Sequence, residues 1–500
     1  MEYLLCLFYT ALFIFIIYRA SFFEVYGLSK KQLSIIFLLK IVAGTTLWAI
    51  YSYYYTDRSS ADIFRYFDDG KVMYNALFTH PSDYFKMLFG VKNNTAQFLS
   101  YYEQMNGWHR RYDSNLYNDS HVLIRFHALA DVFSLGHYHV HTIFICFFTM
   151  IGLTGIYKFF INELKDKSLL LAFCIFLVPS VILWTSGVLK EALIICFLGM
   201  ILYFVKEILL GRARIFFIPS LLFCIWLLFS TKFYVLVALT PALIAFIWVY
   251  KSHNRFILLK YVTAMLVYLV LAQCIRIFIP AYDPIEILRI KQKDFIYTST
   301  GCTYLKNDSM LVMIKPQQRN TVYTADSIHY MIKAGTKFSY INKKNPSDTL
   351  YAISKSDSVK YRMEDDIPET PSRIYLPLIE DTPLSLLKNI PIAIHNSLLR
   401  PVILNKNSLM VTIAAIQDWL LFIYILISLI FSKPFNRIDW NVVLMCLLYT
   451  LIMYLIIGWT TPVLGAIVRY RSPAVPFLLI AFLHVLDLEK LKRLLKPGRN

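Results

Sequence analysis

Long apolar runs alternate along this chain with short charged loops and two long polar segments. A helix needs about 20 mostly apolar residues to cross the hydrocarbon of a bilayer. Runs of that kind lie near 2–19, 32–55, 140–162, 168–187, 189–207, 213–230, 232–251, 255–280, 411–432, 440–459 and 471–488. The pairs near 168–207 and 213–251 are spaced closely enough to be helical hairpins. The pattern predicts an all-α polytopic membrane protein with about eleven transmembrane helices.

The composition agrees with this pattern. The chain is 57% hydrophobic and 16% charged, with a mean hydropathy of +0.53, and a soluble globular protein needs more charge to cover its surface. The net charge of +18 could indicate nucleic acid as a partner. The basic residues lie in short loops between apolar runs, however, so we expect the membrane lipid bilayer as a partner and no nucleic acid.

Basic residues are distributed unevenly between the two sets of loops. One set, with the C-terminal tail, holds Arg19, Lys30, Lys31, Lys158, Lys165, Lys167, Lys206, Arg212, Arg214, Lys251, Arg255, Lys260, Lys433, Arg437, Lys490, Lys492, Arg493, Lys496 and Arg499. The short loops of the other set hold only Lys190, Lys232, Arg469 and Arg471. Because cytoplasmic loops are enriched in lysine and arginine, the pattern predicts that the N-terminus is outside and the C-terminus is in the cytoplasm. In a Gram-negative host the outside is the periplasm, and we expect a location in the bacterial inner membrane.

This topology divides the chain into six parts. They are two N-terminal transmembrane helices (1–55), a first periplasmic segment (56–139), a six-helix core (140–280), a periplasmic insert (281–410), three C-terminal helices (411–490) and a basic cytoplasmic tail (491–500). The aromatic-rich amphipathic stretches 72–89 and 122–135 suit juxtamembrane helices lying along the membrane surface.

The 281–410 insert has a different pattern. Short alternating stretches at Lys337–Ile341, Thr349–Ile353, Val359–Met363 and Arg373–Leu376 are separated by turn residues at 345–348 and 368–371. Alternation of this kind is typical of strands. The insert is therefore predicted to be small and β-rich.

The first charged cluster follows the second apolar run. Asp62 and Arg65 are spaced i, i+3, and Arg65 and Asp69 are spaced i, i+4, with Asp68 beside them, so a helix would place the first two pairs on one face. A carboxylate held by an arginine stays ionised at neutral pH and can act as a base. The alternative is a solvated helix start whose charges pair with one another.

Two further clusters lie in short loops on the same predicted side. Lys190 and Glu191 begin an apolar run, where a lysine and a helix N-terminus both favour a lipid phosphate; the alternative is a Lys–Glu pair that closes a tight hairpin. Arg469 and Arg471 end a stretch that could re-enter the membrane, and guanidinium groups bind phosphate as bidentate forks. Interfacial anchoring is the alternative for these arginines.

Other polar residues give weaker signals. Asp418 is an acid inside an apolar run and is a functional candidate by default, Arg400 follows an amphipathic stretch at the outer surface, and Lys40 is expected to snorkel toward the cytoplasmic end of its helix. The histidines lack metal-ligand spacing, so no metal site is assigned. Walker A, Rossmann and G-x-S-x-G motifs are absent from the sequence, which gives no support to ATP-driven or cytoplasmic nucleotide chemistry.

Three stretches of the chain, with its architecture, resemble a known group of enzymes. They are Asp62-Ile-Phe-Arg65-Tyr66-Phe67, Ser186-Gly187-x-x-Lys190-Glu191 and Arg469-Tyr470-Arg471-x-Pro473-x-x-Pro476. The chain resembles bacterial membrane glycosyltransferases of the GT-C superfamily, the group that includes protein mannosyltransferases and aminoarabinose transferases. In that group the acidic loop follows the first span from a cytoplasmic N-terminus, whereas here it follows the second. An extra N-terminal helix would reconcile the two.

The resemblance implies an activity and roles for the charged residues. The enzyme would move a sugar from a polyprenyl-phosphate carrier to a glycan, lipid or protein acceptor at the periplasmic face. Asp62 would be the base or metal ligand, with Asp68 or Asp69 as substitutes, and the lipid phosphate would be bound by residues drawn from Arg65, Lys190, Glu191, Arg400, Arg469 and Arg471. No cofactor is identified, although the resemblance leaves room for a divalent cation.

Three other functions are compatible with the same sequence. An envelope polysaccharide polymerase would use the same outer cations but extend a chain. A transporter or flippase would use paired, interrupted helices with polar sites at the midplane, for which Asp418, Pro179 and Pro241 are the only hints. A structural subunit of an envelope complex is the third.

Overall fold

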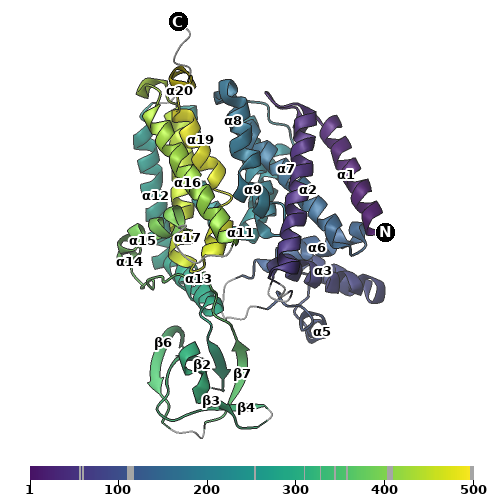
Figure 1. Ribbon diagram of the computed structural model, residues 1–500, viewed down its shortest axis with the longest axis vertical. Coiled ribbons are helices and arrows are strands. Elements are labelled where there is room, and N and C mark those ends of the chain that lie inside the picture. The colour runs from purple at the N-terminus through teal and green to yellow at the C-terminus, as the bar shows by residue number, and fades with distance from the viewer. Residues whose placement is uncertain are drawn as a thin grey trace.

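The protein is a helical bundle that carries a small β-sheet at one end (Figure 1). The computed structural model describes residues 1–495 except 56–57, 59–60, 110–116, 253–254, 309, 327, 343–344, 356–358 and 402–408. Eight helices within these residues are long and apolar enough to cross a membrane: α1 (Glu2–Arg19), α2 (Lys30–Tyr53), α7 (Tyr138–Phe160), α10 (Lys190–Leu209), α11 (Phe217–Lys251), α12 (Ile257–Phe278), α16 (Leu409–Ile430) and α17 (Trp440–Thr460). The prediction of a multi-pass helical membrane protein is confirmed.

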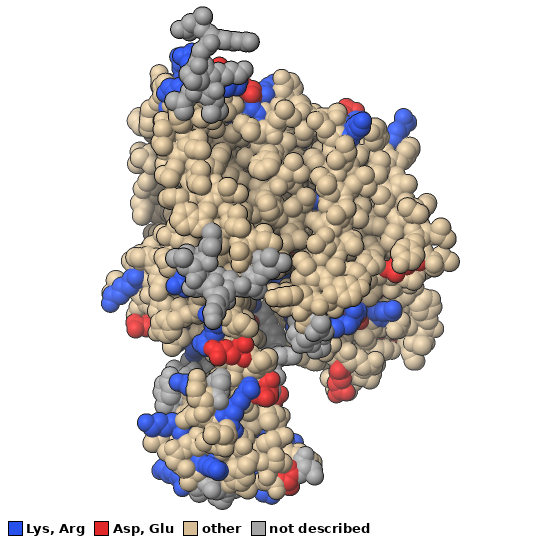
Figure 2. All heavy atoms as spheres, in the orientation of Figure 1, with Lys and Arg blue, Asp and Glu red and all other residues tan. Residues whose placement is uncertain are grey.

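The two ends of the bundle differ. We call the end with the β-sheet the sheet end, and the end with α20 (Leu488–Leu495) the α20 end. Charged side chains gather at both ends, and a broad apolar zone separates them on the face seen in Figure 2. This distribution is what a bilayer requires, because charged side chains are costly in hydrocarbon.

Three of the predicted spans differ from simple straight helices. The run near 168–187 forms α8 (Ser168–Ala172), a π-helical turn (Phe173–Leu177) and α9 (Pro179–Trp184). The chain breaks there because proline lacks an N–H and disfavours helical geometry in the residue before it. The runs near 213–230 and 232–251 form one helix, α11, which leaves helical geometry at Lys232 (φ −154°, ψ 85°).

The last span is a bent pair rather than one helix. α18 (Leu464–Tyr470) and α19 (Val475–Val485) meet at 61°, and this pair is either a broken span or a re-entrant loop. If the pair is one span, the described residues hold up to nine candidate spans.

Glycines allow α7 and α10 to approach closely. A Cβ atom built on Gly199 would lie 1.9 Å from the carbonyl oxygen of Gly152, and one on Gly155 would lie 2.5 Å from the carbonyl oxygen of Gly199. Without a hydrophobic driving force between helices in lipid, such small residues let two backbones make extensive van der Waals contact. This packing holds α10 in place, and the first turn of α10 carries Lys190 and Glu191.

The first polar segment folds into short helices at the sheet end. They are α3 (Asp62–Thr79), α4 (Pro81–Phe89), α5 (Leu99–Tyr102) and α6 (Ser120–Ser134), and they include the amphipathic stretches predicted at 72–89 and 122–135. Met73, Met87 and Leu123 are buried between them, whereas Phe78 and Phe89 are exposed. α3 also carries Asp62, so these helices position the first predicted charged cluster.

The 281–410 insert contains a seven-stranded antiparallel sheet with the order β3-β4-β7-β1-β2-β5-β6. Its strands are β1 (Thr303–Lys306), β2 (Met310–Ile314), β3 (Val322–Thr324), β4 (His329–Ile332), β5 (Lys337–Asn342), β6 (Asn345–Ile353) and β7 (Tyr361–Asp366).

Predicted strands at 337–341, 349–353 and 359–363 overlap β5, β6 and β7. The predicted strand at 373–376 is wrong, because that stretch makes only an isolated bridge. The predicted turn at 345–348 is also wrong: it lies within β6, an edge strand, where a proline is tolerated.

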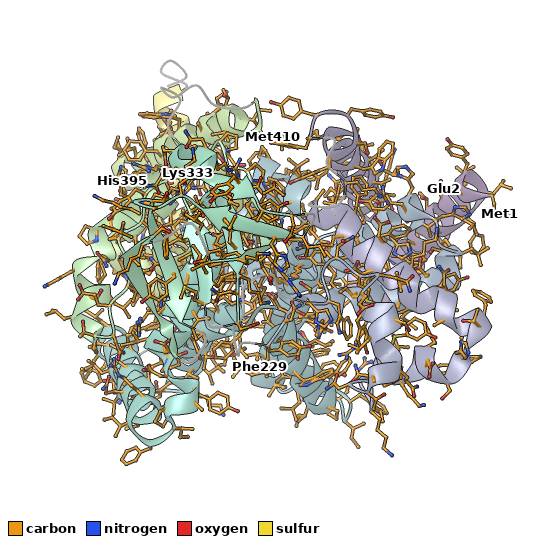
Figure 3. All side chains as sticks on the ribbon, turned by 90° about the horizontal axis from the view of Figure 1, so that it is seen from below. Met1, Glu2, Phe229, Lys333, His395 and Met410 are labelled. Atoms are coloured by element: carbon orange, nitrogen blue, oxygen red, sulfur yellow. The ribbon has the colours of Figure 1, made fainter. Side chains whose placement is uncertain are left out.

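The insert is tied to the bundle by backbone hydrogen bonds. Ile374 N–H donates to the Pro462 carbonyl (2.7 Å), and Leu464 N–H donates to the Ser372 carbonyl (3.0 Å). In α13 (Pro284–Ser299), the Gln292 side chain donates to the Trp459 carbonyl (2.7 Å). These bonds fix the loop that leads into α18. Seen from the sheet end, Lys333 of the insert and His395 lie on one side of the molecule, and Met1 and Glu2 lie on the other (Figure 3).

Candidate functional site

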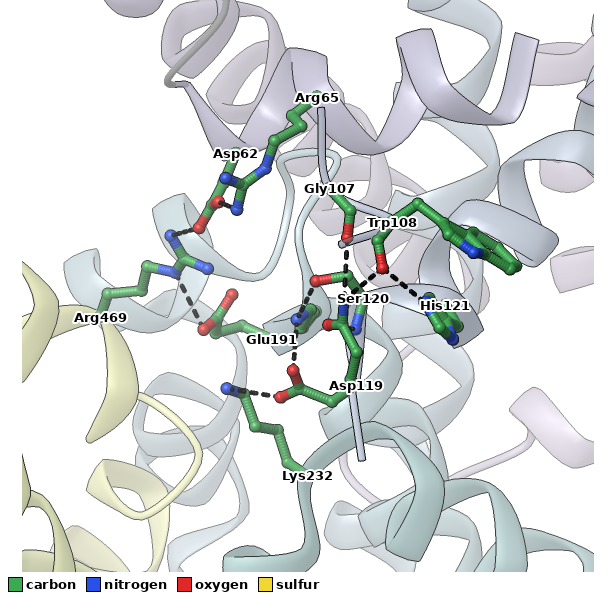
Figure 4. A network of polar contacts seen from close by, with 12 residues as sticks. Asp62, Arg65, Gly107, Trp108, Asp119, Ser120, His121, Glu191, Lys232 and Arg469 are labelled. Carbon is green, nitrogen blue, oxygen red and sulfur yellow. Dashed lines mark hydrogen bonds and ion pairs between the residues drawn. The ribbon is translucent and has the colours of Figure 1, made fainter. Parts of the chain in front are cut away.

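Three charged residues from distant parts of the chain meet at the sheet end of the bundle. Asp62 begins α3, Glu191 lies in the first turn of α10, and Arg469 lies in α18. The Arg469 guanidinium donates to Asp62 Oδ2 (2.8 Å), and its Nε lies 2.9 Å from Glu191 Oε1. Arg65 donates to the other Asp62 oxygen (2.6 Å). Arg469 therefore bridges two carboxylates, as Figure 4 shows.

Glu191 is the least satisfied member of this group. It is 1% exposed, and neither carboxylate oxygen has a hydrogen-bond partner in the described part of the chain, because the nearby Arg469 N–H does not point at Oε1. Its position in the first turn of α10 is favourable for a negative charge. A buried acceptor without a donor is costly, so Glu191 depends on the Arg469 cation 2.9 Å away for its stabilisation.

A second set of charges adjoins the first. Asp119 lies between two ammonium groups, with its Oδ1 3.0 Å from Lys190 Nζ and its Oδ2 3.0 Å from Lys232 Nζ. Lys232 reaches this position because α11 departs from helical geometry there. Tyrosine rings border the cations: Lys190 lies 5.0 Å from the centre of the Tyr66 ring, and Lys232 lies 5.1 Å from that of Tyr470.

The combined cluster carries an excess of positive charge. We refer to the seven residues Asp62, Arg65, Asp119, Lys190, Glu191, Lys232 and Arg469 as the charged cluster. Its four cations and three acids give a net charge of 4 − 3 = +1. The side chains of Asp62, Arg65 and Asp119 remain 20–24% exposed, so a solute can reach the cluster from that side.

Asp62 and Asp119 are ionised at neutral pH. Burial alone would raise the pKa of Asp62, but the Arg469 and Arg65 guanidinium groups and Lys190 outweigh it and hold the pKa well below its usual range. Burial likewise acts against ionisation of Asp119, and Lys190 and Lys232 again lower its pKa well below the usual range. Such shifts arise when opposite charges lie within a few ångströms.

The tight turn before α10 is held against α2. A Cβ atom on Gly187 would lie 2.4 Å from Leu47, and one on Gly44 would lie 2.4 Å from the Ser186 carbonyl oxygen. The turn is also anchored by Lys40, which is fully buried and donates to Thr185 Oγ1 (2.8 Å). The expectation that Lys40 snorkels to the cytoplasmic end is therefore wrong. Its side chain stabilises the turn that presents Lys190 and Glu191.

Asp69 is buried outside the charged cluster and helps to position it. Its carboxylate accepts the N–H groups of Asn106 (2.8 Å) and Gly107 (2.7 Å), and it is 1% exposed. Asn118 in turn donates to the Gly107 carbonyl (3.0 Å), one residue before Asp119. Burial raises the pKa of Asp69 to about 6, although the two backbone N–H groups act in the opposite direction.

Asp68 lies outside the cluster. It points away from Asp69 and pairs with Arg58 through hydrogen bonds of 2.6 and 2.9 Å on the surface. The prediction that Asp68 could substitute for Asp62 has no support from this position. Adjacent residues on a helix do not share a face, which explains why the two neighbouring acids have different partners.

Arg471 and Arg400 belong to a separate buried cluster. The Arg471 guanidinium contacts both oxygens of Asp418 in α16 (2.5 and 2.6 Å), and it also donates to the carbonyl oxygens of Ser397 (3.0 Å) and Arg400 (3.2 Å). Arg471 is 1% exposed. These bonds hold Arg471 away from the charged cluster, contrary to its predicted role beside Arg469. Asp418, which lies in the candidate span α16, serves as its counterion.

Sequence reasoning assigned no role to Asp119, Lys232, Tyr66 or Tyr470. Lys232 gave a signal as one of four basic residues in the short outer loops, and Tyr66 and Tyr470 lie in two of the stretches that carry the resemblance. Within the described ranges, no three histidine, cysteine, aspartate or glutamate side chains are grouped so as to hold a metal ion. Comparisons with protein-family models, with curated proteins and with solved structures found no match.

Proposed function

We propose that this protein is a membrane glycosyltransferase that moves a sugar from a polyprenyl-phosphate carrier to an acceptor at the periplasmic face. The observation that carries the proposal is the meeting of Asp62, Glu191 and Arg469 with the Lys190–Asp119–Lys232 group at one end of the bundle. The cluster joins an ionised carboxylate to an excess of cations where apolar helices end. A lipid-linked phosphate presents its charge at that depth.

In the proposed reaction, the donor phosphate binds between Lys190 and Lys232. In this structure the Asp119 carboxylate lies there, with one oxygen toward each ammonium group. The donor phosphate, which is esterified to both the sugar and the polyprenol, also presents oxygens to both ammonium groups, and it gains a second negative charge when the sugar leaves. The donor phosphate would therefore compete with Asp119 for the same two lysines, and Asp119 is one of the more exposed members of the cluster.

The reaction follows from these positions. The acceptor hydroxyl oxygen forms a bond to the anomeric carbon, its proton passes to the Asp62 carboxylate, and the bond between the anomeric carbon and the carrier phosphate breaks. Each Asp62 oxygen accepts one arginine N–H and keeps a second lone pair for the proton. Lys190, Lys232 and Arg469 stabilise the negative charge that develops on the departing polyprenyl phosphate, and they are already oriented before the reaction begins.

Replacing Asp62 with Asn should reduce sugar transfer by at least about a hundredfold, because removal of a general base typically costs this much. The measurement is transfer of radiolabelled sugar from polyprenyl phosphate by the purified full-length protein, with product length recorded to separate single transfer from polymerisation. Asp68→Asn is the matched control, since it makes the same change six residues along the same helix. Near-normal turnover by Asp62→Asn would remove Asp62 from the mechanism.

The pH dependence of transfer separates Asp62 from Asp69. A carboxylate base is active when ionised, so its rate falls as the pH drops through its pKa. Because the pKa of Asp62 lies below its usual range, transfer should stay constant from pH 8 down to about 4. An acid limb centred near pH 6 would instead match Asp69, whose pKa is about 6, and would contradict Asp62 as the base.

A further inference from the structure

A second charged site lies at the α20 end, far from the charged cluster. A cavity of about 320 Å³ is bordered there by Lys167, Lys433, Arg437, Lys492, Asp166 and Asp487. These residues come from the loop before α8, from the loop after α16 and from the start of α20. The cavity therefore lies where three segments meet at the surface of the bundle.

Two lysines in this cavity lie close together. Lys167 is 3% exposed, and its Nζ donates to the carbonyl oxygens of Leu483 (2.7 Å) and Leu486. The Lys433 side chain is close enough to affect it: burial, and then the neighbouring Lys433, lower the pKa of Lys167 to about 8. Two like charges this near each other indicate a position that an anion would stabilise.

Two of the three acids that border the cavity, Asp487 and Glu489, have other partners, and Asp166 is the third. Asp487 accepts the N–H groups of Glu489 and Lys490 (3.1 and 3.2 Å) at the start of α20, and Glu489 pairs with Lys492 (3.0 Å). Lys433 and Arg437 have no acidic partner in the part of the chain that the structure describes. Positive charge on these two side chains is thus free to bind a ligand.

We propose that this cavity binds a phosphate group, supplied by the headgroup of an anionic lipid in the adjacent leaflet. The cavity lies at the end of apolar helices that face lipid, and basic pockets between transmembrane helices favour anionic headgroups. A headgroup phosphate between Lys433 and Arg437 would be paired with both cations.

The test is the thermal unfolding midpoint of the full-length protein in detergent, titrated with phosphatidylglycerol, with phosphatidylcholine or with inorganic phosphate. Phosphatidylglycerol should raise the midpoint at lower concentrations than phosphatidylcholine. Lys433→Gln/Arg437→Gln should weaken this effect about thirtyfold. Both side chains are partly or fully exposed, so the variant should fold. The matched control Arg212→Gln/Arg214→Gln removes two exposed charges from a neighbouring loop and should leave the effect unchanged.

The inorganic phosphate arm identifies the source of the ligand. Stabilisation by inorganic phosphate that is lost in Lys433→Gln/Arg437→Gln would support a phosphate site and assign it to the free ion. Equal weakening by the two double variants would overturn the proposal, because it would mean that the lipid responds only to total charge. Absence of stabilisation by all three additions would overturn it as well.

Discussion

Replacing Arg469 with Gln should abolish sugar transfer and destabilise the protein by about 3–5 kcal/mol, the usual effect of removing one member of a buried ion pair. Arg469 bridges Asp62 and Glu191, and its side chain is only 10% exposed. Without it, Glu191 would be a buried charge with no cation in contact, and Asp62 would retain Arg65 alone. The Arg469→Lys variant should retain little of the transfer or the stability, because a single ammonium group cannot reproduce a planar bridge between two carboxylates.

A double variant separates the structural effect of this change from its effect on chemistry. Glu191→Gln/Arg469→Gln removes both buried charges, so the stability should return most of the way to that of the wild type while transfer remains absent. The control is Arg58→Gln, which breaks an exposed pair with Asp68 and should change stability by less than about 1 kcal/mol. Recovery of transfer in the double variant would show that the pair has only a structural role.

Replacing Asp418 with Asn should destabilise the protein by about 3–5 kcal/mol while leaving transfer per folded molecule unchanged. Asp418 is the counterion of Arg471, and their side chains are 8% and 2% exposed. This pair joins α16 to the bend between α18 and α19, and it does not contact the charged cluster. The measurement is the thermal unfolding midpoint together with the transfer rate of the folded fraction.

A paired variant again provides the control. Asp418→Leu/Arg471→Met replaces both buried charges with apolar side chains and should recover most of the stability, because the cost of desolvating the pair is then removed. If Asp418→Asn folded normally and yet lost transfer, Arg471 would belong to the reaction and the two clusters would act together.

The apolar pattern predicted the helices well where nothing interrupts them. α2, α7, α10, α12 and α17 begin and end within a few residues of the predicted runs, because about 20 apolar residues can satisfy their backbone in lipid only as a helix. Pro179 interrupts the helix within an apolar run of the same length, and a hydropathy profile does not detect this interruption. The strands β1 to β4 were missed because they are short, and because β1 and β4 also pair with β7, which lies further along the chain.

Five of the seven members of the charged cluster could be found from the sequence, but their partners could not. Asp62, Lys190, Glu191 and Arg469 were recognised because charged residues next to apolar runs require an explanation. Arg471 was assigned to the same site as Arg469. Residues two apart on a helix do not face the same neighbours, so the side chains diverge to Asp62 and to Asp418. The placement of Asp119 depends on tertiary structure, which a single sequence does not encode locally.

If the charged cluster binds a lipid-linked phosphate, the full-length protein should bind polyprenyl phosphate through that cluster. Native mass spectrometry should detect the bound lipid on the wild type and on Lys433→Gln/Arg437→Gln. The triple variant Lys190→Gln/Asp119→Asn/Lys232→Gln removes both lysines together with the acid between them, so that no unpaired carboxylate remains. In this variant binding of the lipid should fall at least about tenfold. Equal binding by this triple variant and the wild type would contradict the account.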